Sequence, residues 1–187
     1  MAADPGRGLS VATAERAAPA GPAVVLIGPP GSGKSSVAAA LGSYTGLPVR
    51  DTDADVEVAA GRTISDIFTQ EGEAVFRELE STAVAAALDE HRGVLALGGG
   101  AVLNPDTRQR LAGHPVVFLS VSMPVGVRRT GLAANRPLLV GVNPRATYKA
   151  LLEARLPVYR EVAVLEIDTD DLSVDQVAQV ISAEFGL

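Results

Sequence analysis

Residues 28–35 read GPPGSGKS and fit the pattern G-x-x-x-x-G-K-[ST], which is typical of a phosphate-binding P-loop. The apolar run at 24–27 predicts a buried parallel strand before the motif, and residues 37–41 predict a helix after it. In that context the backbone N–H groups of the turn and the helix amino terminus form an anion nest. The motif therefore predicts a nucleotide-phosphate site, and the alternative is a glycine-rich turn that binds nothing.

Two side chains of this motif have expected roles. Lys34 is expected to reach the β- and γ-phosphates of a nucleotide, and the hydroxyl of Ser35 is expected to hold Mg²⁺.

Composition limits the class of protein. A chain of 187 residues suits one α/β domain, and its formal charge of −6 argues against a nucleic-acid surface. It contains no cysteine, so thiolate metal sites and disulfides are excluded and a cytoplasmic location is favoured. Glycine or proline interrupts the apolar runs well before they could span a membrane. Residues 1–22 are rich in alanine, glycine and proline without an apolar stretch, which predicts a disordered leader rather than a signal peptide.

Short apolar segments alternate with amphipathic ones along the rest of the chain. The segments expected as strands are 24–27, 47–50, 94–97, 116–121 and 162–168. The segments expected as helices are 37–41, 54–60, 64–68, 73–90, a short one that starts at 104 or 106 and ends at 111, 124–130, 144–160 and 173–185. Residues 131–141 show little pattern and predict a loop. This alternation predicts an α/β fold with a five-stranded parallel sheet flanked by helices, whose functional groups gather at the carboxyl ends of the strands.

An acidic pair follows the second expected strand, whereas the third ends at Gly98 with no acid available. If the segment is extended, Asp51 and Asp53 face the same way because side chains alternate along a strand. Asp51 would then hold Mg²⁺ through water, and Asp53 would accept or orient the proton of an acceptor hydroxyl. The alternative is a solvated loop or a helix N-cap.

Three consecutive glycines, Gly98, Gly99 and Gly100, follow the third expected strand. They allow the backbone to approach a ligand without obstruction by a Cβ atom. The alternative is an ordinary turn between a strand and a helix.

Three arginines are candidates for binding carboxylate or phosphate, for which a guanidinium suits bidentate pairing. Arg77 lies on a helix with Glu73 and Glu80 at spacings that could brace it. Arg136 lies in the unpatterned loop, where a basic side chain could close over phosphates, and Arg155 lies within a helix. For each of the three, the alternative is a solvated surface charge.

Taken together, these stretches resemble the shikimate kinase family, over roughly residues 23–185. The matching stretches, in the family's order, are GPPGSGKS at 28–35, DTD at 51–53, ISDIF at 64–68, GE at 72–73 with FRELE at 76–80, LGGGAV at 97–102, RPLL at 136–139, and Tyr148 followed by Arg155. The P-loop alone is shared by many enzymes, but the whole set is specific.

The resemblance implies an ATP:shikimate 3-phosphotransferase of chorismate and aromatic amino acid biosynthesis. The implied P-loop kinase fold has a lid near 131–141 and substrate-binding helices near 53–82, within one domain spanning 23–187. The implied ligands are ATP, shikimate and Mg²⁺. We expect a cytoplasmic monomer with no nucleic-acid or membrane partner.

The resemblance also implies roles for individual residues. Those implied to bind ATP are Gly31, Ser32, Gly33, Lys34, Ser35 and Ser36, with Arg136 as the lid arginine and Arg129 against adenine. Those implied or expected to bind shikimate are Asp53, Arg77, Gly98, Gly99, Gly100 and Arg155, with Glu80 bracing Arg77 and with Phe68 and Phe76 beside the ring. Ser35 and Asp51 are the expected metal ligands, and Asp53, Lys34 and Arg136 the expected catalytic residues.

The chain departs from the family in the loop after the last strand. Family members often carry an arginine near adenine there, but this chain has Leu172. We therefore expect an apolar or backbone-mediated contact with the base. Two other functions stay open at this point: a different small P-loop kinase, acting on gluconate or a nucleoside monophosphate, and a nucleotide-binding module without catalysis.

Overall fold

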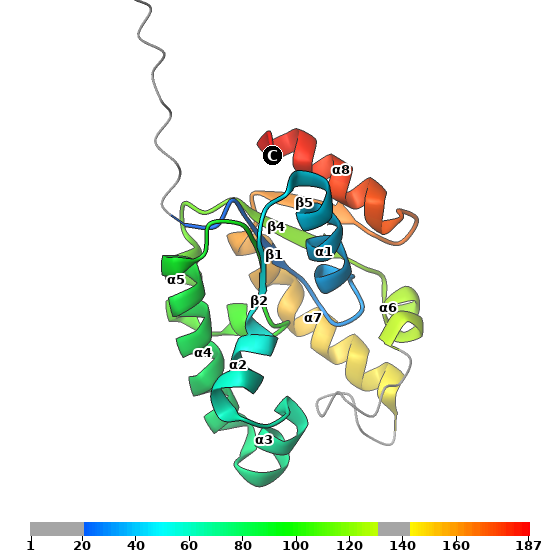
Figure 1. Cartoon of the computed structure of the whole chain (residues 1–187). Helices are drawn as coiled ribbons and strands as arrows, with labels where there is room; N and C mark the ends of the chain where they lie inside the picture. Colours follow the sequence, from blue (N-terminus) through cyan, green and yellow to red (C-terminus); the bar gives the residue numbers. More distant parts are fainter. Residues whose placement is uncertain (1–20, 131–142) are drawn as a thin grey trace, which may run out of the picture.

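The computed structural model describes residues 21–130 and 143–187 (Figure 1). Within them, five strands form one parallel sheet in the order β2-β3-β1-β4-β5, as expected. The strands are β1 (Val24–Ile27), β2 (Val49–Asp51), β3 (Val94–Ala96), β4 (Val116–Ser120) and β5 (Leu165–Asp168). Strand β1 is central because the chain builds β2 and β3 on one side of it and β4 and β5 on the other. Its carboxyl end therefore opens at a topological switch point, where α/β sheets bind ligands.

The helices follow the expected pattern. They are α1 (Lys34–Thr45), α2 (Thr52–Ala60), α3 (Ile64–Gln70), α4 (Gly72–Glu90), the 3₁₀ turn η1 (Ala101–Leu103), α5 (Pro105–Leu111), α6 (Met123–Thr130), α7 (Pro144–Val162) and α8 (Val174–Phe185). The expectation of a strand from residue 162 is wrong at its start. Helix α7 continues to Val162, where the N–H of Ala163 still bonds to the carbonyl of Tyr159, so β5 begins only at Leu165.

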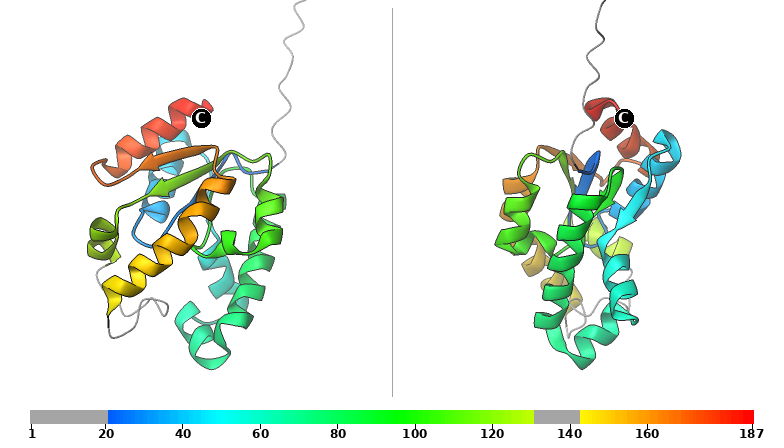
Figure 2. Two further views of the ribbon diagram at one scale, coloured as in Figure 1. Left: turned by 180° about the vertical axis from the view of Figure 1, so that it is seen from behind. Right: turned by 60° about the vertical axis from the view of Figure 1, so that its left-hand side comes forward.

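Helices cover both faces of the sheet (Figure 2). Val24 and Leu26 of β1 pack with α1 and α8, while Val25 and Ile27 pack with α4, α5 and α7. All four side chains are at most 1% exposed. Two apolar faces explain why this strand is a continuous apolar run rather than an alternating one.

Helices α2, α3 and the first half of α4 form a smaller layer below the sheet in Figure 1. Their shared core contains Val56, Ile67 and Phe76. The rings of Phe68 and Phe76 pack at a centroid separation of 4.7 Å. Phe76 is 5% exposed, so much of its ring serves this core. This layer holds one end of α4 and of α2 in place below the carboxyl edge of the sheet.

Gly21 and Pro22, which we assigned to the leader, are buried in the domain, with Gly21 against the ring of His114. Residues 1–20 and 131–142, including Arg136 and the expected lid, lie outside the described residues. Within the described ranges, no helix combines the length and the apolar character needed to cross a bilayer.

Candidate active site

The P-loop leads into the amino terminus of α1, where the N-cap residue makes no side-chain hydrogen bond to the first turn. Gly33 is the N-cap, with a left-handed φ of 93°, and it has no side chain that could accept a hydrogen bond from the first turn. Ser173, by contrast, caps α8 with its hydroxyl, which accepts from the N–H of Gln176. The first turn of α1 also carries no acidic residue. Exposed N–H groups and the helix dipole at this end favour a bound anion.

The side chains of Ser32 and Lys34 belong to the same loop as this anion nest. The hydroxyl of Ser32, in a residue only 1% exposed, makes no hydrogen bond within the described part of the chain. A buried hydroxyl without a protein partner requires an explanation, and a bound ion or ligand beside the loop would supply one. The ammonium of Lys34 donates to the carbonyls of Gly28, at 2.9 Å, and Pro29, at 3.2 Å. The positive charge of Lys34 is therefore held over the loop.

Two oxygen ligands suited to Mg²⁺ lie side by side. The hydroxyl of Ser35 donates to Oδ2 of Asp51 at 2.9 Å, so a serine and a carboxylate oxygen meet at the start of α1. Mg²⁺ prefers such oxygens and keeps waters and substrate phosphates as its remaining ligands. Two protein oxygens beside a phosphate nest therefore fit a nucleotide-bound Mg²⁺.

The conformation expected for the acidic pair is wrong, although both acids face the site. Asp51 is the N-cap of α2, where its Oδ1 accepts from the N–H of Asp53 at 3.0 Å, and Asp53 lies in the first helical turn. The alternation of an extended segment therefore does not apply. The Asp51 carboxylate instead serves two functions, because one oxygen caps α2 and the other accepts from Ser35.

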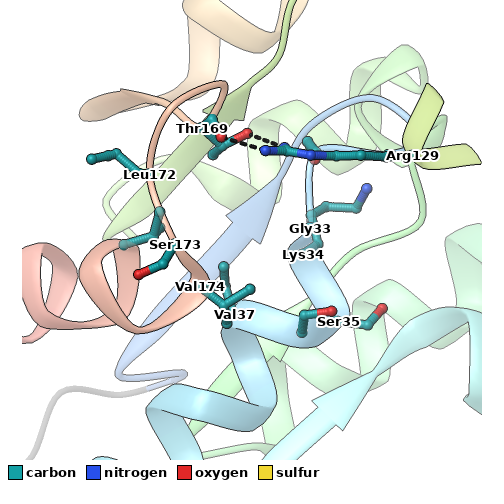
Figure 3. A pocket seen from close by; sticks show the side chains of 13 residues that line it. Gly33, Lys34, Ser35, Val37, Arg129, Thr169, Leu172, Ser173 and Val174 are labelled. Carbon is teal, nitrogen blue, oxygen red and sulfur yellow. Dashed lines mark hydrogen bonds between the residues drawn. The ribbon is translucent and has the colours of Figure 1, made fainter. Parts of the chain in front are cut away.

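A cavity of about 490 Å³ lies beside the P-loop (Figure 3). The residues that line it are Gly31, Ser32, Gly33, Lys34, Ser35, Ser36, Val37, Arg129, Thr169, Leu172, Ser173, Val174 and Val177. The guanidinium of Arg129 is fixed against the loop after β5, where it donates to the hydroxyl of Thr169 at 3.0 Å and to its carbonyl at 2.6 Å. Leu172, Val174 and Val177 give this cavity an apolar part of its lining.

The three consecutive glycines follow β3, and they provide space rather than unusual backbone angles. None of Gly98, Gly99 and Gly100 has a positive φ. A Cβ on Gly98 would overlap the carboxylate oxygens of Asp53 and Glu80, and one on Gly100 would overlap the guanidinium of Arg77. Side chains of α2 and α4 thus occupy the positions that side chains at 98 and 100 would take.

Arg77 and its acidic partners form a network on α4. Its Nη1 donates to Oε2 of Glu80 at 2.6 Å, and its Nη2 donates to Oε1 of Glu73 at 2.9 Å. Burial raises the pKa of Glu80, while the positive charges of Arg77 and Arg155 oppose that rise. Burial lowers the pKa of Arg77, but the charges and hydrogen bonds of Glu80 and Glu73 outweigh this effect, so the pKa is raised above the ordinary arginine value.

Arg155 is buried, which excludes the alternative of a solvated surface charge. The residue is 7% exposed, and its Nη1 donates to the carbonyl of Gly99 at 3.0 Å. The hydroxyl of Tyr159 donates to the same carbonyl at 2.5 Å. Burial raises the pKa of Tyr159 to about 12, although the charge of Arg155 opposes it, so the phenol stays protonated at neutral pH.

The P-loop and the glycine triplet, which contacts Arg77 and Arg155, lie close to each other. A Cβ on Gly99 would lie 3.3 Å from the carbonyl oxygen of Gly28 in the P-loop. Thr52, fully buried between the two acids, accepts from the N–H of Gly98 at 3.1 Å and ties the start of α2 to the glycine triplet. Loops following β1, β2 and β3 therefore converge on one site.

The expected site residues within the described ranges fall into two adjoining groups. Those around the P-loop and its cavity are Gly31, Ser32, Gly33, Lys34, Ser35, Ser36, Asp51 and Arg129; those around the glycine triplet are Asp53, Arg77, Gly98, Gly99, Gly100 and Arg155. The structure brings these groups together, and the role of each residue stays a prediction. Arg136 lies outside the described residues.

Reasoning from sequence gave no role to three polar residues of the site, although Thr52 and Tyr148 lie in the stretches that carry the family resemblance. Thr52 and Tyr159 contact the glycine triplet, and the hydroxyl of Tyr148 donates to the carbonyl of Pro30 in the P-loop at 2.8 Å. A signal was available for Tyr159, because it follows Arg155 by four residues and so shares its helix face.

Comparisons with known proteins agree with this geometry. A family model described as shikimate kinase matches residues 30–185. A shikimate kinase of Saccharopolyspora erythraea is 56% identical over 87% of this chain and 95% of its own length. A shikimate kinase of Salinispora arenicola is also 56% identical, over 87% of this chain and 96% of its own length. The solved structure of a shikimate kinase from Acinetobacter baumannii in complex with shikimate superposes with a TM-score of 0.85 at 33% identity, covering 90% of this chain and 95% of that one.

Proposed function

The chain belongs to the shikimate kinase family, and from this premise we propose how its residues transfer the γ-phosphoryl group of ATP to shikimate. The reaction phosphorylates the 3-hydroxyl of shikimate on the route to chorismate and the aromatic amino acids. The observation that carries the proposal is the contact between the two loops, where Gly99 lies against Gly28. An anion nest therefore lies beside a cluster of buried and half-buried acids and arginines, as a donor and a charged acceptor require.

The P-loop side binds the donor. We propose that the N–H groups of residues 31–36 and the ammonium of Lys34 bind the phosphates of ATP, with Arg136 of the expected lid at 131–141 as a further phosphate ligand. The apolar part of the cavity lining at Leu172 receives the base, beside Arg129. Ser35 and Asp51 hold Mg²⁺, which when bound neutralises charge on the phosphate oxygens.

The side of the glycine triplet binds the acceptor. Arg77 and Arg155 suit the shikimate carboxylate, because a guanidinium pairs with a carboxylate in bidentate geometry. Asp53 takes the proton of the 3-hydroxyl as the oxygen forms its bond to phosphorus, while the bond from phosphorus to the bridging oxygen breaks and ADP leaves. Helices within residues 53–82, which pack around a core of Val56, Ile67 and Phe76, form the acceptor side.

The experiment that tests the proposal is an acceptor screen. The purified chain is incubated with Mg-ATP and shikimate, gluconate or a nucleoside monophosphate, and release of ADP is measured. We expect turnover with shikimate alone. Turnover of gluconate or of the nucleoside monophosphate without shikimate would overturn the proposal, and binding of ATP without any turnover would favour a nucleotide-binding module without catalysis.

The chain offers a matched control because it contains two lysines, Lys34 and Lys149. Lys34→Met removes the ammonium over the P-loop, whereas Lys149→Met removes an exposed one, paired with Glu153 at 3.7 Å on α7. Activity that survives Lys34→Met would come from a contaminating kinase of the expression host. If the kinase activity belongs to this chain, Lys34→Met should abolish it and Lys149→Met should keep it.

We also propose that the chain works as a monomer in the cytoplasm. The absence of cysteine from the sequence suits a reducing compartment. Light scattering after size exclusion tests the oligomeric state, and a mass near twice the 19.2 kDa of one chain would contradict it.

A further inference from the structure

Helix α7 carries two buried tyrosines for which the proposed reaction has no role. Tyr148 is 1% exposed and Tyr159 is 0% exposed. The hydroxyl of Tyr148 donates to the carbonyl of Pro30 at 2.8 Å, and that of Tyr159 donates to the carbonyl of Gly99 at 2.5 Å. Pro30 belongs to the P-loop and Gly99 to the glycine triplet. Helix α7 therefore makes one hydrogen bond to the P-loop, which we call the donor loop, and a second to the glycine triplet, which we call the acceptor loop.

The two phenol rings are fixed by packing. A Cβ on Gly126 of α6 would overlap the ring of Tyr148, so this glycine provides the space in which the ring lies. The ring of Tyr159 stacks on Phe118 of β4, with centroids 4.9 Å apart and planes inclined by 19°. Burial and packing against these neighbours hold each ring, and with it each hydroxyl, at a defined point.

The spacing of these residues places them on one face of α7. Tyr148, Arg155 and Tyr159 stand at i, i+7 and i+11, which brings them to the same side of an α-helix. Arg155 donates to the Gly99 carbonyl as well, so that carbonyl accepts from two side chains of the same helix. Both lone pairs of the oxygen are then used, and the peptide has a single orientation.

A fixed carbonyl also fixes the next N–H group. In a trans peptide the N–H of the following residue points away from the carbonyl, so holding the Pro30 carbonyl sets the direction of the Gly31 N–H. Holding the Gly99 carbonyl sets the Gly100 N–H in the same way. Gly31 and Gly100 are expected to bind the donor and the acceptor respectively.

We propose that Tyr148 and Tyr159 are positioning residues through which α7 orients the donor loop and the acceptor loop separately. Tyr148 sets the P-loop for the phosphates of ATP, and Tyr159 sets Gly99 and Arg155 for shikimate. This inference rests on the proposed function. Because the pKa of Tyr159 is raised to about 12 by burial, its phenol remains a hydrogen-bond donor throughout the pH range of an assay.

The test replaces each tyrosine by phenylalanine, which keeps the ring and removes only the hydroxyl. Titration calorimetry measures the Kd of the β,γ-imido analogue of ATP with Mg²⁺ and, separately, the Kd of shikimate. Tyr148→Phe should weaken the analogue by about five- to tenfold and leave shikimate within about twofold, as loss of one hydrogen bond predicts. Tyr159→Phe should do the reverse.

The remaining tyrosine of the chain, Tyr44, provides the matched control. It is 65% exposed on α1, so Tyr44→Phe should leave both Kd values unchanged. If Tyr148→Phe and Tyr159→Phe lower only the melting temperature, or weaken both ligands equally, the hydroxyls have a purely structural role and the inference is wrong. If the wild-type chain binds neither ligand, the proposed function fails and the inference fails with it.

Discussion

Nη1 of Arg77 lies 2.6 Å from Oε2 of Glu80, one helical turn further along α4. The side chain of Glu80 is 4% exposed and that of Arg77 is 23% exposed, so the carboxylate is buried while its partner reaches the site. A buried ion pair adds little net stability, but removing one partner leaves an uncompensated buried charge. Arg77 therefore compensates the buried charge of Glu80, and Glu80 fixes the orientation of the Arg77 guanidinium.

Arg77→Ala should destabilise the fold by about 2–4 kcal/mol, because the buried Glu80 carboxylate loses its closest cation. It should also raise the KM for shikimate while leaving the Kd of ATP unchanged. Urea unfolding and steady-state kinetics measure the two effects. Arg50→Ala is a matched control: its partners Asp55 and Glu90 are 29% and 66% exposed, against 4% for Glu80, so the loss should cost less than about 1 kcal/mol. An unchanged KM in Arg77→Ala would place Arg77 outside the site.

The stability deficit of Arg77→Ala should depend on pH. Burial raises the pKa of Glu80 in the folded chain above its unfolded value, so this group favours folding most at low pH and loses that contribution as pH rises through the folded pKa. Removing Arg77 removes an opposing charge and raises the folded pKa further. The deficit relative to wild type should therefore be smaller at about pH 4 than at about pH 7. Equal deficits at both values in urea unfolding would mean that Glu80 does not carry the effect.

Asp53→Asn should lower kcat by about a hundredfold or more and leave ATP binding intact, because the amide cannot accept the proton of the acceptor hydroxyl. Single-turnover kinetics separates this chemical step from binding. Asp55→Asn on the same helix is the matched control, since Asp55 pairs with Arg50 on the surface. Near-normal turnover in Asp53→Asn would remove Asp53 from the mechanism.

Much of the fold could be predicted because its signals are local. The continuous apolar run at Val24–Ile27, the glycines that end α1 and α2, and the serine that caps α8 each determine the local conformation through nearby residues. The boundary between α7 and β5 was harder to predict from the sequence. Residues 162–164 are apolar in either state, and only the hydrogen bond from Ala163 to Tyr159 identifies the helix end.

The site was predictable in its motifs and less so in its contacts. The type of each charged residue indicated its chemistry, but the burial of Arg155 depends on the position of α7 against the glycine triplet. The same applies to Tyr148, whose partner Pro30 lies 118 residues away in sequence. The side-chain direction of Asp53 was inferred from the wrong backbone, since the helix cap at Asp51 was considered only as an alternative.

Gly100→Ala should displace Arg77 without unfolding the chain. The added Cβ would overlap the guanidinium, which is the far end of a flexible side chain and can move aside. A misplacement of about 1 Å near a reacting group costs on the order of a hundredfold in kcat/KM. Circular dichroism should match wild type while the KM for shikimate rises. Gly98→Ala should instead displace Asp53 and Glu80, so its loss should appear in kcat as well. A normal kcat/KM in both variants would show that these glycines are turn residues only.

Thr52→Val should separate the hydrogen bond of Thr52 from its packing, because valine has nearly the same shape but no hydroxyl. Thr52 is fully buried and accepts from the N–H of Gly98 at 3.1 Å, so the variant leaves a buried donor unpaired at a cost of about 1–3 kcal/mol. The same bond joins α2 to the glycine triplet, so its loss should lower kcat through Asp53 while the Kd of ATP stays constant. Thr52→Ser keeps the hydroxyl and should restore kcat even though it loses a methyl group. If Thr52→Ser lowers kcat and Thr52→Val does not, packing at this position rather than the hydrogen bond holds Asp53 against the acceptor.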